Sequence, residues 1–82
     1  MPENRITAAQ CRGARGMIGL SQSELAATAG IGRQTVVDFE RGARSPYDGS
    51  LAAIRAALEA AGVEFIAENG GGTGVRLRKD QP

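Results

Sequence analysis

The most informative part of the chain is the stretch LSQSELAATAGIGRQTVVDFERG, residues 20–42. Within it, Ser21 and Glu24 have the spacing of a capping box, in which a hydroxyl and a carboxylate three residues later satisfy free amides at a helix start. Gly30 suits the left-handed backbone of a sharp turn, which residues with a side chain rarely adopt. The stretch therefore predicts two short helices, over residues 22–29 and 33–41, joined by a tight turn.

The apolar residues of this stretch are predicted to fill the space between the two helices and the rest of the core. They are Leu25, Ala26, Ile31, Val36 and Phe39. The helix predicted over residues 33–41 keeps polar residues on its outward side, with Arg33 and Gln34 at its first turn. Arginine can bond to guanine and glutamine to adenine in the major groove of DNA. Because two short helices around a glycine turn form a helix-turn-helix, we expect Arg33 and Gln34 to read bases.

The segments on either side complete one small domain. Apolar residues at helical spacing predict a helix over residues 7–18 and another over 50–61, the first capped by Thr7 and the second by Ser50 or Asp48. After Gly62 the spacing changes, and VEFIAE and VRLRK on either side of NGGGTG indicate a β-hairpin. The predicted fold is mainly α: a four-helix DNA-binding domain over residues 1–62, with a C-terminal β-hairpin extension over residues 63–82.

Residues 11–58 resemble the Cro/C1-type helix-turn-helix proteins, also called the XRE family. The resemblance rests on the apolar positions of LSQSELAATAGIGRQTVVDFERG, its alanine, its glycine and the terminal Glu-x-Gly. It implies a compact helical domain that binds operator DNA, usually as a two-fold dimer. Gly32 stands where the family often has a Ser or Thr cap, and a hairpin replaces the usual fifth helix, so the mode of dimerisation is not inherited from the resemblance.

The resemblance also implies roles for particular residues. Base reading falls on the start of the third helix and one turn beyond: Arg33, Gln34, Thr35 and Asp38. Contacts with DNA phosphates fall on the start of the second helix and the loop after the third: Gln22, Arg41, Arg44 and the amides around Ser45. A structural ion pair between the first and third helices falls on Arg15 and Glu40. For Asp38 two interpretations stay open: its carboxylate accepts a hydrogen bond from a cytosine amino group, or it forms an intrahelical or interchain pair.

The hairpin has more apolar surface than the small helical core obviously needs. An isolated two-stranded hairpin is marginal in water and exposes unpaired edges. We therefore expect a homodimer on a near-palindromic operator, with the hairpins of two subunits paired. Its interface would contain Val63, Phe65, Ile66, Val75 and Leu77. The rival expectation is that the hairpin packs on its own subunit and the chain is a monomer.

The composition of the chain limits the classes of function that we expect. The chain has 82 residues, a net charge of +1, one cysteine and no histidine, so neither an intrachain disulfide nor a zinc site is expected, and no cofactor. No run is long enough to span a membrane, and a cytoplasmic protein is expected. Without histidine, clustered carboxylates or a nucleotide motif, an enzyme is not expected. The leading expectation is a sequence-specific DNA-binding transcriptional regulator, a repressor that reads the major groove with the helix over residues 33–41. The alternative is a protein-interaction module, such as the antitoxin or anti-repressor half of a protein pair.

Overall fold

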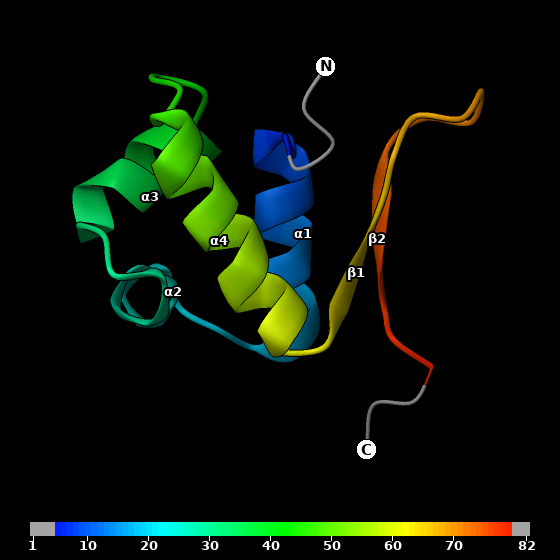
Figure 1. Ribbon diagram of the computed structural model, residues 1–82, viewed down its shortest axis with the longest axis horizontal. Helices are drawn as coiled ribbons and strands as arrows, with labels where there is room; N and C mark the ends of the chain where they lie inside the picture. The colour runs from blue at the N-terminus through cyan, green and yellow to red at the C-terminus, as the bar shows by residue number, and fades with distance from the viewer. Residues whose placement is uncertain (1–4, 80–82) are drawn as a thin grey trace.

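The computed structural model describes residues 5–79, which form four helices followed by one antiparallel hairpin (Figure 1). This arrangement confirms the predicted fold class. The elements are α1 (Ala8–Ile18), α2 (Gln22–Ala29), α3 (Arg33–Glu40), α4 (Asp48–Ala60), β1 (Val63–Ile66) and β2 (Gly74–Leu77).

Local hydrogen bonds explain where the first two helices begin and end. Thr7 caps α1 and Ser21 caps α2, and each forms a full capping box, with Gln10 and Glu24 respectively. Gly30 ends α2 with φ 72°, a left-handed conformation that disfavours any residue with a Cβ atom. The predicted capping box and glycine turn are therefore both present.

The start of α4 differs from the prediction. The helix begins at Asp48, two residues before the predicted start, and its N-cap is Tyr47, which makes no side-chain capping bond. The backbone carbonyl of Tyr47 accepts the first helical bond, from the amide of Leu51 at 2.9 Å. The expected caps, Ser50 and Asp48, are thus inside the helix, where the carboxylate of Asp48 favours the positive end of the helix dipole.

The core lies where α1 and α4 meet the other elements. In Figure 1, α2 and α3 lie on one side of these two helices and the hairpin lies on the other. Cys11, Leu25, Val36, Ile54 and Leu58 are completely buried, and Ala26 is 3% exposed. Ile31 is only partly buried against this core. The core therefore holds the helix-turn-helix unit against α1 and α4.

The hairpin packs on its own subunit. Its strands pair with Phe65 opposite Val75, and both side chains pack against the core. The buried side chain of Gln10 fastens the hairpin to α1, because its amide nitrogen donates to the carbonyls of Ile66 at 3.3 Å and Gly74 at 2.9 Å. Val63 is 1% exposed, so its side chain has almost no surface left to offer a second subunit.

Candidate nucleic-acid interface

The helix α3 presents a polar surface that the core does not use. Arg33 and Gln34 are exposed at its first turn, and Thr35 beside them is partly buried. Gly32 caps α3 without a side-chain bond, which leaves amide groups at the helix start available to other partners. Val36 and Phe39 are buried in the core, and helical spacing places Gln34 and Asp38 on the opposite side of α3.

Asp38 lies one turn beyond this end and is bonded to its neighbours. Its carboxylate accepts from Gln34 Nε2 at 2.9 Å and from Arg41 Nη2 at 3.3 Å. These bonds, the one from Gln34 foremost, hold the pKa of Asp38 below its usual value. In the chain without DNA, Asp38 is therefore paired with neighbouring side chains of its own subunit. Because Gln34 uses one amide hydrogen for this bond, its second hydrogen and its oxygen stay available for a base.

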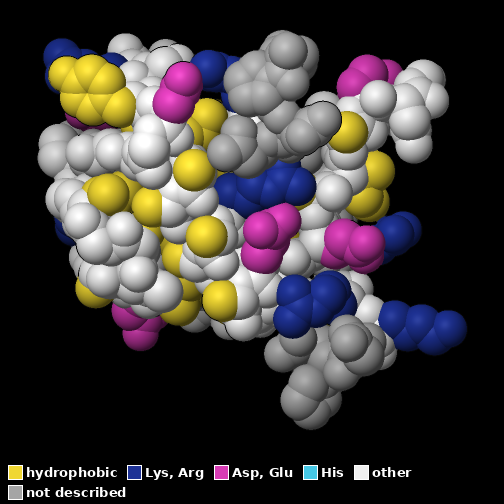
Figure 2. Space-filling model, viewed as in Figure 1, with side chains coloured by type: hydrophobic (Ala, Val, Ile, Leu, Met, Phe, Trp, Pro, Cys, Tyr) yellow, Lys and Arg dark blue, Asp and Glu magenta, His cyan; other side chains and the backbone are white. Residues whose placement is uncertain are grey.

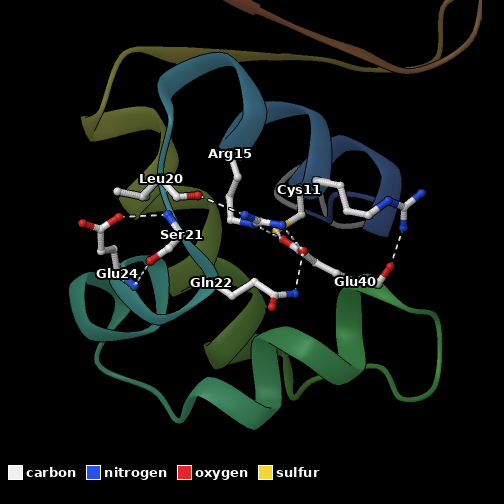
Figure 3. A network of polar contacts seen from close by, with 8 residues as sticks. Cys11, Arg15, Leu20, Ser21, Gln22, Glu24 and Glu40 are labelled. Atoms are coloured by element: carbon white, nitrogen blue, oxygen red, sulfur yellow. Dashed lines mark hydrogen bonds and ion pairs between the residues drawn. The ribbon is translucent and has the colours of Figure 1, made fainter.

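Glu40, at the other end of α3, is the centre of a buried polar network (Figure 3). Its carboxylate is 3% exposed and accepts from Arg15 through two nitrogens, Nε and Nη2, each at 2.7 Å. The Cys11 thiol donates to it at 3.1 Å and Gln22 Nε2 at 3.1 Å. The Arg15–Glu40 pair expected from the resemblance is thus present, and it ties α1 to α3.

Two further residues of α1 strengthen this tie. Arg12 Nη1 donates to the backbone carbonyl of Glu40, one of the carbonyls that the end of a helix leaves unsatisfied. Burial, and next the hydrogen bond to Glu40, raise the pKa of the Cys11 thiol far above its usual value. Cys11 therefore stays protonated and acts as a hydrogen-bond donor in the core rather than as a reactive thiolate.

Acid should weaken this network. Burial alone would raise the pKa of Glu40, but hydrogen bonds from Arg15, Cys11 and Gln22 outweigh it and hold the pKa below 4.5. The stabilising contribution of Glu40 is therefore fully present above pH 4.5, its usual pKa, and is lost as the pH falls through the lower folded pKa. In urea unfolding at a series of pH values, we expect the stability difference between the natural chain and Glu40→Gln to shrink below pH 4.5. A difference that stays constant down to the acid transition would contradict this role.

The candidate phosphate contacts occupy two different environments. Arg41, Arg44 and Ser45 are exposed in and around the loop after α3. Gln22 is partly buried, and its amide nitrogen points to Glu40 (Figure 3). The loop residues are therefore open to solvent, whereas the Gln22 side chain takes part in the buried network around Glu40.

Three contributors to this architecture were missed by the sequence analysis: Gln10, Cys11 as a donor, and Arg12. Thr7 and Gln10 have the same capping-box spacing as Ser21 and Glu24. The role of Gln10 at the start of α1 can therefore be predicted from the sequence. The bonds from Gln10 to the hairpin and from Arg12 to Glu40 join residues far apart in the chain. The spacing of residues along the sequence does not predict such contacts.

Neither a metal centre nor a membrane span is apparent in residues 5–79. Within that range, no group of three His, Cys, Asp or Glu side chains is placed to hold a metal ion. None of the helices described there is both long enough and apolar enough to cross a bilayer.

Comparison with known proteins supports the geometric description. A family model described as Helix-turn-helix matches residues 12–64, from the first turns of α1 to the first residues of β1. No curated protein matches the chain significantly. Most of the hairpin lies beyond the matched region, so the family model covers the helical domain and leaves the extension unaccounted for.

Proposed function

The chain belongs to the Cro/C1-type helix-turn-helix (XRE) family of DNA-binding regulators, and from this premise we propose that it is a sequence-specific transcriptional repressor. The observation that carries the proposal is the contrast between the two ends of α3. Glu40 is clamped to α1 by Arg15 and Arg12, whereas Arg33 and Gln34 are exposed. A helix that is fixed at one end and exposes arginine and glutamine at the other suits base reading in the major groove.

A direct binding assay tests this proposal. Fluorescence anisotropy with duplex DNA from upstream of the chain's own gene should give specific binding that weakens steeply between about 50 and about 200 mM salt. A scrambled duplex of equal length should bind at least about a thousandfold more weakly. Equal affinity for both duplexes would contradict sequence-specific recognition, and a reporter gene unaffected by the bound protein would contradict repression.

We expect the loop arginines to contact phosphates. Replacing Arg41 or Arg44 with alanine should weaken binding to cognate and scrambled DNA alike, and each should reduce the slope of log K against log salt by about one. Lys79→Ala is the matched control, because Lys79 is an exposed cation that follows the end of β2, outside both the strand and the loop after α3. An affinity loss confined to the cognate duplex would show base reading instead.

The proposal includes a homodimer formed through the hairpin. The strand β2 carries Leu77, whose residue surface is 46% exposed, and α1 carries Met17 at 43%. A Cβ atom at Gly13 would lie 3.5 Å from Val75; Met17 is one helical turn beyond Gly13, and Leu77 is two residues beyond Val75. Because α1 and β2 run in the same direction in Figure 1, Met17 and Leu77, each near the end of its element, lie toward the same end of the molecule. Pairing of two β2 edges would cover both.

Pairing through this edge would give each dimer two copies of α3. The hairpin and α3 lie on opposite sides of a molecule 30 Å across (Figure 1). A two-fold axis at the hairpin edge would therefore place the two α3 helices at the outer ends of the dimer. Dimers of helix-turn-helix proteins bind half-sites one turn of DNA, about 34 Å, or a multiple of one turn apart, and the operator of such a dimer is a near-palindrome.

Leu77→Gln and Met17→Gln should convert the dimer to a monomer. Each change puts an amide into the proposed apolar contact without altering the charge. The matched control is Tyr47→Gln, because Tyr47 is the other large apolar side chain exposed within residues 5–79 and lies before α4, at 88% exposure. Sedimentation equilibrium at tens of micromolar should give a dimer for the natural chain and the control. If the natural chain sediments as a monomer, the proposed homodimer is wrong.

A further inference from the structure

A groove of about 860 Å³ opens between the loop after α3, the start of α4 and the hairpin. We call it the α4–hairpin groove; its walls include residues 5–8 and 42–46 and, from the hairpin segment, Phe65, Ala67, Glu68 and Thr73. Its volume is within the range of sites that bind small molecules in proteins, about 300–1,000 Å³. The DNA-reading end of α3 takes no part in its lining, so the groove is a separate feature of the surface.

The floor of the groove is apolar and partly aromatic. Ile6, Phe39, Leu51 and Phe65 line it. The first three expose only 4%, 8% and 4% of their surfaces, so they present their edges, and Phe65 contributes a half-buried ring. Such a floor suits a flat or elongated apolar body, which gains free energy by leaving water.

The rim of the groove is mostly basic. Arg5, Arg44 and Arg55 line it, against one carboxylate, Glu68. Figure 2 shows basic and acidic side chains gathered in the region between α4 and the hairpin. Arg5 donates to Asp48 at 2.9 Å, and Arg55 donates to Glu59 at 2.9 Å with its guanidinium 5.2 Å from the centre of the Phe65 ring.

Arg44 is the rim cation best placed to receive a ligand. Among residues 5–79 it forms no ion pair, and it is exposed. An apolar floor next to such a guanidinium complements a molecule with one anionic group, since arginine matches a carboxylate or sulfonate with two parallel hydrogen bonds. We propose that the α4–hairpin groove binds a small apolar monoanion, with its body on the floor and its anionic group on Arg44.

Occupancy of the groove should oppose DNA binding, a consequence that rests on the proposed function. Phe39 belongs to α3, and Arg44 is expected to grip phosphate. Gly42 turns the chain between them with φ 75°, and the amides of Ala43 and Arg44 both donate to the carbonyl of Asp38. A ligand that holds Arg44 over the groove removes it from the DNA backbone. By linkage, DNA must weaken the ligand by the same factor.

The binding step is tested with 8-anilinonaphthalene-1-sulfonate, an apolar monoanion, on the full chain labelled with ¹⁵N. We expect saturable amide shifts at residues 42–46 and 65–73, and at least about tenfold weaker binding of the neutral analogue N-phenyl-1-naphthylamine. Ala67→Trp, which fills the groove, should abolish the shifts. Ala60→Trp is the matched control, because Ala60 is exposed on α4 and does not line the groove. Equal binding of the neutral analogue, or binding that survives Ala67→Trp, would overturn the site.

A dilution series without the probe excludes a different occupant. If the amides of residues 42–46, which lie outside the hairpin, shift with protein concentration alone, a second copy of the chain fills the groove and the proposal is wrong. We expect no such shifts at residues 42–46.

The coupling step is measured separately by anisotropy on operator DNA. Saturating probe should raise the Kd for DNA at least about threefold in the natural chain and in Ala60→Trp, but not in Ala67→Trp. A probe that binds in the groove and leaves the Kd for DNA unchanged would overturn the coupling. A chain that binds the probe but no DNA at all would refute the proposed repressor function and with it the coupling, while the amide shifts would still support the ligand site.

Discussion

Arg15→Met should lower the free energy of unfolding by about 3 kcal/mol or more, because it leaves the carboxylate of Glu40 buried without its cation. Removing one partner of a buried ion pair typically costs about 3–5 kcal/mol. Glu40 is 3% exposed, and its remaining donors, Cys11 and Gln22, are neutral. Since small domains are stable by only about 5–15 kcal/mol in total, this loss is a large fraction of the whole.

Glu40→Gln should cost less than Arg15→Met. The neutral amide leaves no buried charge behind, and the Arg15 side chain, 21% exposed, can still reach water. The double variant Arg15→Met/Glu40→Gln should therefore be more stable than the sum of the two single losses predicts, since the interaction is lost only once. Urea denaturation of the four proteins measures this difference, and strictly additive losses would mean that the two side chains do not interact.

The hairpin offers a matched control for this cycle. Arg76 and Glu64 also form an Arg–Glu pair, at 2.8 Å, but their side chains are 62% and 46% exposed. Exposed pairs contribute at most about 1 kcal/mol, so Arg76→Met should change stability little. A loss as large as that of Arg15→Met would show that burial is not the reason for the Arg15 effect.

Arg33→Ala and Gln34→Ala should each weaken binding to the cognate operator by about 1–3 kcal/mol and relax the preference at one base position. Both side chains are exposed, so neither change should affect folding stability by more than about 0.5 kcal/mol. Gln34→Ala also removes the hydrogen bond that Asp38 accepts from Gln34 at 2.9 Å, which leaves a carboxylate with one donor fewer near the DNA. We therefore expect its affinity loss to be greater than the loss of one glutamine contact alone.

Thr28→Ala controls for changes on the helix-turn-helix surface, because Thr28 is exposed on α2 and is not among the predicted contacts. It should bind the operator as the natural chain does. If binding-site selection with Arg33→Ala/Gln34→Ala returns the same preferred sequence as the natural chain, the assignment of base reading to these residues is wrong.

The sequence predicts the parts of this fold that depend on local chemistry. The Ser21–Glu24 capping box and Gly30 set the ends of α2, and both signals lie within one or two turns of the residues they control. The start of α4 was predicted two residues too late because Tyr47 caps it through its backbone alone. Because such a cap uses only the backbone, no particular residue type at that position predicts it.

The features that the sequence does not predict are contacts between distant segments. Gln10 reaches the hairpin across more than fifty residues, and Arg12 reaches the end of α3. The α4–hairpin groove is likewise assembled from segments at both ends of the chain. Periodicity and spacing describe which face of an element is buried, but the partner on that face depends on how the elements pack. For this reason the hairpin residues Phe65 and Val75 were expected to face a second subunit, whereas they also pack on their own core.

Selection of duplexes from a random DNA library with the natural chain measures whether α3 reads DNA sequence. We expect strong enrichment of one near-palindromic sequence, with half-sites about 10 base pairs, or a multiple of that, apart from centre to centre. A library that remains random after repeated rounds, although the chain is folded and retains DNA, would contradict this expectation.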